Sequence, residues 1–175
     1  MDATELSIPT SRKNPTAVER TSERELVVTR TFDAPADRVF EAWTKPELLQ
    51  RWWAPKSFGV SFLSCEADVR SGGAYRFVFA HPASQDPMAF FGRYIDVAPR
   101  ARLVWTNEEG GEDGALTTVT FEDRGGETLV VMHDLHPSKK ALDDAIASGG
   151  ACGLGETFEQ LDELLAIPCA GREIR

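Results

Sequence analysis

Two consecutive helix-forming segments in residues 30–55 constrain the fold more than any other feature of this chain. The sequence there reads RTFDAPADRVFEAWTKPELLQRWWAP. Pro35 stands where a first helical residue is expected, because its missing N–H costs nothing there, and Asp37 follows in the positively polarised first turn. Pro46 and Glu47 repeat this arrangement further along. The sequence therefore predicts two short helices in series.

Each of the two predicted helices carries an apolar stripe at helical spacing. The stripes consist of Ala36, Val39, Phe40 and Trp43 in the first helix and of Leu48, Leu49 and Trp52 in the second. Aromatic side chains dominate core burial, so both helices must pack against another element. Trp52 continues the second stripe whereas Trp53 lies off it. We therefore expect Trp52 to anchor the core and Trp53 to lie at a cavity mouth.

The composition argues against several classes of function. The net charge is −9 and the isoelectric point is about 4.9, which disfavours nucleic acid because phosphate binding requires a clustered basic surface. Cys65, Cys152 and Cys169 show no paired spacing, so neither a disulfide framework nor a zinc ribbon is indicated. No apolar run approaches the ~20 residues of a membrane-spanning helix, and no signal peptide is evident. We expect a cytoplasmic protein without membrane insertion, metal or cofactor.

The 175 residues fit one globular domain with terminal extensions. Residues 1–24 are polar and show no sustained period, which predicts a flexible N-terminal arm. Residues 25–167 form the predicted domain, and residues 168–175 form a C-terminal tail that begins at a helix-stopping proline.

Short strand-like segments separated by turn signals fill the middle of the chain. They cover residues 25–33, 58–68, 74–80, 88–97, 101–107, 116–123 and 127–134. Their spacing predicts an antiparallel meander, and Gly92 inside one of them predicts a bulge or a close approach. The inward faces are expected to carry Tyr75, Phe77, Phe79, Trp105, Phe121 and Val131.

Helical signals return at the end of the chain. Residues 138–148 predict a helical turn or two. From about Cys152 to Ile167 an apolar stripe of Leu154, Phe158, Leu161, Leu164 and Leu165 predicts the longest amphipathic helix. We expect this stripe to cover the inward face of the sheet.

Three stretches together resemble one known superfamily. They read FDAPADRVFEAWTKPELLQRWWAP, DVRSGGAYRF and GRYIDVAPRARLVWT. With the order strand, two short helices, six strands and long helix, residues 25–167 are similar to the START-like helix-grip superfamily (SRPBCC). Within it, the chain resembles the bacterial family named after the activator of heat shock protein 90 ATPase. Several separate motifs in the right order make the resemblance specific.

The resemblance implies an α+β helix-grip fold. A curved antiparallel sheet of seven strands would wrap around the C-terminal helix, with the two short helices between its first two strands and a mostly hydrophobic cavity inside. Members are small-molecule binders, lipid carriers or cyclase-like enzymes. The family's last helix usually opens with a glycine-tryptophan pair, whereas this chain has Gly155, Glu156 and Thr157. Either the cavity is wider at this end, or Phe158 fills the gap.

Nine residues are the candidate ligand-binding positions. We expect the cavity to be lined by Trp53, Phe58, Tyr75, Phe77, Phe79, Tyr94, Trp105, His133 and Phe158. His133 is in phase with Leu129 and Val131, which predicts that it points inward. With an ordinary pKa of about 6.5, it could hydrogen-bond a ligand or shuttle a proton. The alternative is a satisfied core or rim histidine, since no nucleophile stands at a recognisable spacing.

Three functions remain open at this point. The favoured one is binding of a hydrophobic or aromatic small molecule in the cavity, without catalysis. The second is a cyclase- or hydratase-like enzyme that uses His133 as acid or base, with Tyr94 or Asp68 assisting. The third is interaction with a chaperone, which rests on the family name alone. A homodimer is one open option for the oligomeric state.

Overall fold

The structure, a computed structural model, describes residues 15–54, 56–108, 114–148 and 150–166, with side chains of 150–153 excepted. The strands are β1 (Ala17–Arg20), β2 (Glu25–Phe32), β3 (Ser61–Ala67), β4 (Ala74–Ala80), β5 (Met88–Ala98), β6 (Arg102–Thr106), β7 (Leu116–Asp123) and β8 (Thr128–Leu135). The helices are α1 (Ala36–Thr44), α2 (Pro46–Trp52), α3 (Lys139–Ala147) and α4 (Gly150–Ala166), with a 3-10 turn, η1, at Lys56–Phe58.

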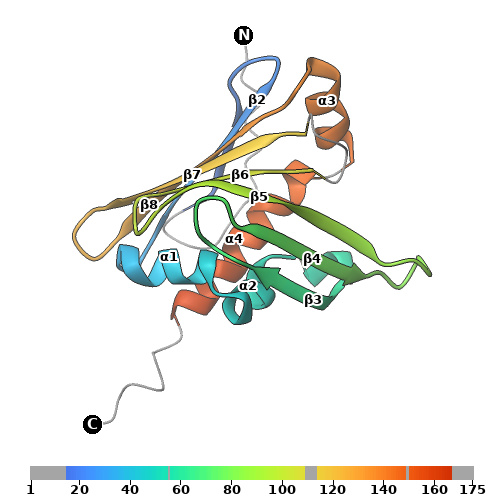
Figure 1. Cartoon of the computed structure of the whole chain (residues 1–175). Helices are drawn as coiled ribbons and strands as arrows, with labels where there is room; N and C mark the ends of the chain where they lie inside the picture. The colour runs from blue at the N-terminus through green and yellow to red at the C-terminus, as the bar shows by residue number, and fades with distance from the viewer. Residues whose placement is uncertain (1–14, 55, 109–113, 149, 167–175) are drawn as a thin grey trace.

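All strands of the described chain form one antiparallel sheet in the order β1-β2-β8-β7-β6-β5-β4-β3. The chain leaves β2, passes through α1, α2 and η1, and re-enters the sheet at the opposite edge as β3. Helices α1, α2 and α4 lie on the same side of the sheet (Figure 1). The expected α+β helix-grip architecture is therefore confirmed.

In the described part of the chain the sheet has eight strands rather than the predicted seven, because part of the expected N-terminal arm pairs with β2. Residues 17–20, expected in a flexible arm, form β1 and pair with β2 from Ala17 opposite Thr29 to Arg20 opposite Leu26. The segment has four residues and is mostly exposed. It therefore lacks the alternation that identifies a strand in sequence. Residues 1–14 and 167–175 lie outside the described part of the chain.

The inner face of the sheet and the stripe of α4 form the core. Val28 and Phe32 of β2 belong to one buried cluster with Phe158 and Leu161 of α4, and the rings of Phe32 and Phe158 lie 5.6 Å apart. On β8 the buried residues are Thr128, Val130 and Met132. The expectation that Val131 points inward was wrong. Both faces of this strand are apolar, so its hydrophobicity does not fix its phase.

The two short helices form as expected, with one difference at the start. Pro35 is the N-cap of α1 with an extended backbone, and the helix begins at the next residue. Pro46 is the first residue of α2. Trp52 is 1% exposed and its Nε1 donates a hydrogen bond to the Ala42 carbonyl at 2.8 Å. Trp52 therefore joins α2 to α1, which confirms it as a core anchor.

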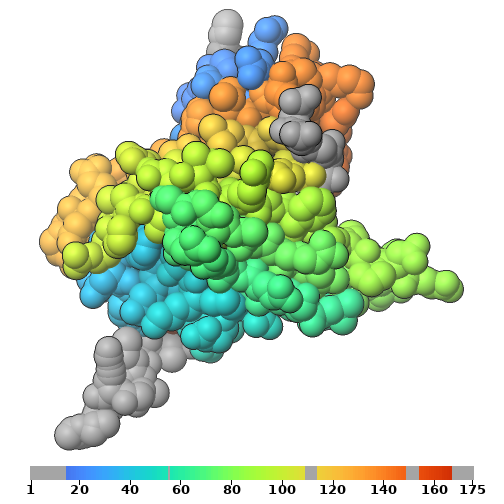
Figure 2. All heavy atoms as spheres, viewed as in Figure 1, coloured from blue at the N-terminus to red at the C-terminus, as the bar shows by residue number. Residues whose placement is uncertain are grey.

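The expected close approach at Gly92 is confirmed. A Cβ atom built on Gly92 would lie 2.0 Å from the carbonyl oxygen of Thr106. The ladder between β5 and β6 shifts register immediately afterwards, between Tyr94 and Asp96. On the other side of Gly92, towards the turn that joins β4 to β5, this hairpin extends away from the rest of the molecule, and Figure 2 shows it as a projection.

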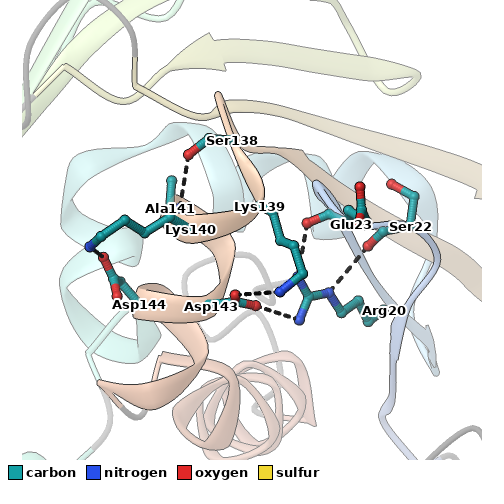
Figure 3. Close-up of polar contacts among 9 residues, drawn as sticks. All are labelled: Arg20, Ser22, Glu23, Ser138, Lys139, Lys140, Ala141, Asp143 and Asp144. Carbon is teal, nitrogen blue, oxygen red and sulfur yellow. Dashed lines mark hydrogen bonds and ion pairs between the residues drawn. The ribbon is translucent and has the colours of Figure 1, made fainter.

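Helix α3 is tied to the first hairpin by polar contacts (Figure 3). Ser138 caps the helix by accepting a hydrogen bond from the Ala141 amide at 3.1 Å. Asp143 lies 2.8 Å from Arg20 at the end of β1 and 2.9 Å from Lys139. These contacts connect β1 to α3 on the surface. In the described part of the chain, no helix is long and apolar enough to cross a membrane.

Candidate functional site

A cavity of about 260 Å³ lies between the sheet and α4. Strands β6, β7 and β8 contribute one wall, and α1, α2, η1 and α4 contribute the others. The lining residues are Trp43, Trp52, Trp53, Phe58, Trp105, Asn107, Thr117, Met132, Asp134, Leu154, Thr157 and Phe158. An apolar cavity of ~150 Å³ already accommodates benzene. This cavity therefore has room for a small organic molecule.

All four tryptophans of the chain line this cavity. The ring of Trp43 lies centrally, with centroid distances of 4.8 Å to Trp52, 6.0 Å to Trp53 and 6.1 Å to Trp105. The first two pairs meet edge to face, the arrangement that aromatic quadrupoles prefer. The Nε1 of Trp43 is buried and has no hydrogen-bond partner in the described part of the chain.

A polar corner interrupts the aromatic lining. Asn107 donates from Nδ2 to Oγ1 of Thr117 at 3.0 Å, and Thr117 donates from Oγ1 to Oδ1 of Asp134 at 2.6 Å. Nearby, Tyr75 donates from its hydroxyl to the Thr106 carbonyl at 2.8 Å. Thr117 accepts from Asn107 and donates onward, so of these two residues only Thr117 bonds the carboxyl of Asp134 directly. The Asp134 carboxyl is therefore the terminal acceptor of this series of hydrogen bonds.

Burial dominates the electrostatics of Asp134. Removal of the carboxyl from water raises its pKa. The hydrogen bond from Thr117 and the electrostatic interactions with His136 and His133 lower this pKa. The net direction is upward, because hydrogen bonding only partly offsets the cost of removing a charge from water. Perturbed pKa values cluster at functional sites, so the Asp134 carboxyl is a candidate binding group.

Hydrogen bonds from helix α4 hold the end of α2 and the following η1 turn at the edge of the cavity. Gln160 accepts a hydrogen bond from the Lys56 amide at 2.8 Å and donates to the carbonyls of Trp52 and Ala54 at 3.0 and 2.9 Å. One turn earlier, Glu156 accepts from the Ser57 amide at 2.9 Å. These bonds hold the end of α2 and the following turn against α4. They thereby fix the positions of Trp53 and Phe58.

The first turns of α4 show what replaces the glycine-tryptophan pair. Glu156 turns to Ser57, Thr157 lines the cavity, and Phe158 lines it while packing 5.6 Å from the ring of Phe32. No aromatic side chain stands at Gly155, Glu156 or Thr157. The cavity is therefore bounded there by a small polar side chain, with Phe158 one position further on.

Of the predicted lining residues, Trp53, Phe58, Trp105 and Phe158 border the 260 Å³ cavity. Phe58 is 44% exposed and lies at its rim. Three others, Tyr75, Phe77 and Tyr94, border a separate void of about 10 Å³ together with Trp53 and Trp105. Such a void holds one water at most.

Phe79 borders neither space. It is buried and packs against Phe62 at 4.3 Å and Phe90 at 5.5 Å, at the outer end of β4. The sequence correctly indicated a buried face. It could not show that the sheet extends beyond the cavity in this direction.

The predicted inward orientation of His133 was wrong. Its Nε2 lies 3.2 Å from the carboxylate of Glu25, on the face of the sheet opposite to the cavity. Hydrogen bonds from Ser22 and His133 lower the pKa of Glu25. Asp134, the next residue, points inward instead. The interior group on this strand is therefore an acid rather than an imidazole.

Sequence reasoning also missed Asn107 and Thr117. They lie on or next to strands whose alternation places them inward, but polar residues at such positions resemble ordinary strand ends. The phase of β7, in which Thr117, Val119 and Phe121 alternate, is the signal that indicates Thr117.

Other reactive groups give no second site. Among the described residues, no group of three or more His, Cys, Asp or Glu side chains is placed to hold a metal ion. Burial raises the pKa of the Cys65 thiol to about 11. At neutral pH this cysteine is therefore protonated and a poor nucleophile.

Family comparison agrees with the geometry. Residues 33–166 match the family described as Activator of Hsp90 ATPase homolog 1-like protein. The chain belongs to this family. The Activator of Hsp90 ATPase homolog 1-like family is part of the START-like (SRPBCC) superfamily and has a small-molecule-binding fold. A search of curated proteins finds no significant match.

Solved structures share this fold. A crystal structure of a protein from Rhodobacter sphaeroides is 25% identical, has a TM-score of 0.78, and aligns 90% of this chain with 99% of the other. One from Nitrosomonas europaea is 25% identical with a TM-score of 0.75, covering 83% and 96%. The solution structure of a family member from Aeromonas hydrophila, 19% identical with a TM-score of 0.63 and coverage of 85% and 96%, shows the fold alone.

Proposed function

We propose that this protein binds an aromatic or otherwise apolar small molecule in the 260 Å³ cavity between the sheet and α4. The observation that carries the proposal is the convergence of all four tryptophans, Phe58, Phe158 and Met132 on one cavity. Cavities lined by aromatic side chains with a few placed polar groups are typical of small-molecule sites.

The size of the cavity restricts the ligand. Pockets for drug-sized molecules are usually about 300–1,000 Å³, and this one is slightly smaller at about 260 Å³. A long acyl chain or a large polyketide would require the walls to move. One- and two-ring molecules fit the walls as they stand.

Two alternatives have less support. The enzymatic hypothesis relied on His133 as acid or base, and that ring lies outside the cavity beside Glu25. The chaperone hypothesis relies on the wording of the family description. A shared fold hosts many functions, so this wording does not identify a partner. We therefore propose binding rather than catalysis.

The proposal can be tested by titrating the purified chain with neutral one- and two-ring aromatics such as ethylbenzene and naphthalene. Because every tryptophan borders the cavity, occupancy should change the intrinsic fluorescence saturably. The urea-unfolded chain, which has no cavity, serves as the control and should show no saturation. Native mass spectrometry of freshly purified protein checks for a copurified ligand. Absence of both a saturable change and a bound molecule would contradict the proposal.

A further inference from the structure

The cavity is acidic at one point and carries no basic lining residue. Asp134 is its one acidic residue, and no Lys, Arg or His belongs to its described lining. In the described part of the chain, Asp134 forms no ion pair with Lys or Arg. Its charged neighbours are His133 and His136, which are not part of the cavity lining. A charged carboxyl without a cation on the cavity side is unfavourable unless a ligand supplies one.

The hydrogen bonds leave one oxygen of this carboxyl available. Thr117 donates to Oδ1 at 2.6 Å. No hydrogen bond to Oδ2 occurs within the described residues. The position of Thr117 is itself fixed by Asn107, which donates to it at 3.0 Å. The acceptor is therefore held in place, with capacity for one more donor.

The remaining walls favour positive charge as well. Four indole rings border the same space as Asp134, and tryptophan is the side chain whose face attracts cations most strongly. Desolvation strengthens such an attraction to about 2 kcal/mol or more. An apolar cavity made only for neutral hydrocarbons would require neither the carboxyl nor the two polar groups that orient it.

We propose that the ligand of this cavity is an organic cation, with an aromatic body and a protonated amine that contacts Oδ2 of Asp134. The inference rests on the proposed function, because it specifies the chemistry of the molecule bound there. The aromatic body would lie among the indoles of Trp43, Trp53 and Trp105. The amine would donate to Oδ2 while Thr117, positioned by Asn107, donates to Oδ1.

The test compares three probes of similar shape and different charge. Phenylethylammonium, 2-phenylethanol and 3-phenylpropionate are titrated into the chain and into Asp134→Asn and Asp144→Asn. Asp144 lies on α3, exposed and paired with Lys140, so the second variant removes the same charge away from the cavity. A charge-assisted hydrogen bond predicts at least about tenfold tighter binding of the ammonium than of the alcohol. The anion should bind most weakly.

Asp134→Asn should reduce ammonium affinity to the level of the alcohol, and Asp144→Asn should leave the ratio unchanged. If the alcohol binds as well as the ammonium in the unaltered chain, the cation inference is overturned while the proposed function stands. That comparison does not depend on how the variant folds. If none of the probes, nor neutral aromatics, bind at all, the proposed function itself fails.

Discussion

Arg30 is a buried cation that connects the sheet to α4. It is 1% exposed on the inner face of β2. Its Nη1 lies 2.9 Å from Oγ1 of Thr16 and 3.3 Å from the Glu159 carboxylate, and its Nη2 lies 3.4 Å from the Asp162 carboxylate. Removing one partner of a buried ion pair costs about 3–5 kcal/mol, because the remaining charges stay poorly solvated. We expect Arg30→Met to lower the free energy of unfolding in urea by about 3 kcal/mol.

Arg102→Met is the matched control for this prediction. Arg102 pairs with Asp96 on the surface, where its side chain is half exposed. Exposed pairs contribute about 0–1 kcal/mol. Equal losses in the two variants would show that burial of Arg30 is not what makes its ion pairs matter.

Asp134 should make the stability depend on pH in a defined direction. Burial raises its pKa above the ordinary value of 3.8. The folded state therefore binds the proton more tightly than the unfolded state, and the free energy of unfolding falls as the pH rises from 3.8 through the raised value. Asp134→Asn removes this loss. We expect the ligand-free variant to be more stable than the parent at neutral pH, with the advantage shrinking on acidification.

Urea unfolding between acidic and neutral pH measures this advantage. His136 and His133 act on the same carboxyl, and their protonation opposes the upward shift. Asp144→Asn, which changes an exposed carboxyl, should show no such dependence. A neutral-pH destabilisation by Asp134→Asn would mean that the carboxylate is well satisfied without a ligand.

The side chain of Gln160 joins two elements that are far apart in the sequence. It bonds the Lys56 amide and the carbonyls of Trp52 and Ala54, at the C-terminal end of α2. Gln160→Leu would leave these groups unpaired, at a cost of about 1–3 kcal/mol. Hydrogen exchange of residues 52–58 should accelerate, since the segment at the cavity rim loses its attachment to α4.

Gln50→Leu provides the control, because Gln50 is exposed on α2. Surface changes of this kind usually stay within about 0.5 kcal/mol. Unchanged exchange at residues 52–58 in Gln160→Leu would indicate that apolar packing alone holds the segment.

Gly92 permits strands β5 and β6 to approach each other. An added methyl group would meet the Thr106 carbonyl oxygen at 2.0 Å, so Gly92→Ala must separate the strands. We expect the free energy of unfolding to fall by at least about 3 kcal/mol, at the upper end for overpacked sites.

Gly125→Ala is the comparison, since nothing lies within 4 Å of its added methyl. Its φ of +72° alone should cost roughly 1–2 kcal/mol. Thermal unfolding that ranks Gly125→Ala as the worse substitution would contradict this account.

The sequence predicted well those elements whose structure is determined by neighbouring residues in the chain. Pro46 and the stripe ending in Trp52 identify α2 because proline position and helical period are properties of adjacent residues. The phase of β8 was missed because both Val130 and Val131 are apolar, and only pairing with β2 decides which faces inward. Because the strand was assigned the wrong phase, the sequence predicted His133 at the site, where the structure has Asp134.

At the scale of the whole molecule, the site depends on sheet order. Asn107, Thr117 and Asp134 are separated along the chain, and the pairing of β6, β7 and β8 brings them together. The resemblance predicted the architecture that makes this possible. It could not predict the polar corner, because that corner consists of this chain's own side chains at inward positions of three neighbouring strands.

The open cavity at the centre of this fold lowers the stability of the whole molecule. Unfilled space forfeits dispersion contacts, and filling it commonly stabilises a protein while impairing function. Leu154→Phe adds a ring from α4 into the 260 Å³ space. We expect this variant to bind neutral aromatics at least about tenfold more weakly, the loss that corresponds to about 1.4 kcal/mol, while its melting temperature stays equal or rises.

Leu63→Phe makes the same change on β3, where Leu63 is 58% exposed and outside the cavity lining. It should leave both ligand affinity and melting temperature unchanged. Two readouts are needed because a fall in both affinity and stability would mean that the ring does not fit and distorts α4. Retained affinity in a stable Leu154→Phe variant would place the ligand elsewhere. Loss of affinity without loss of stability would separate a cavity maintained for a ligand from a defect in packing.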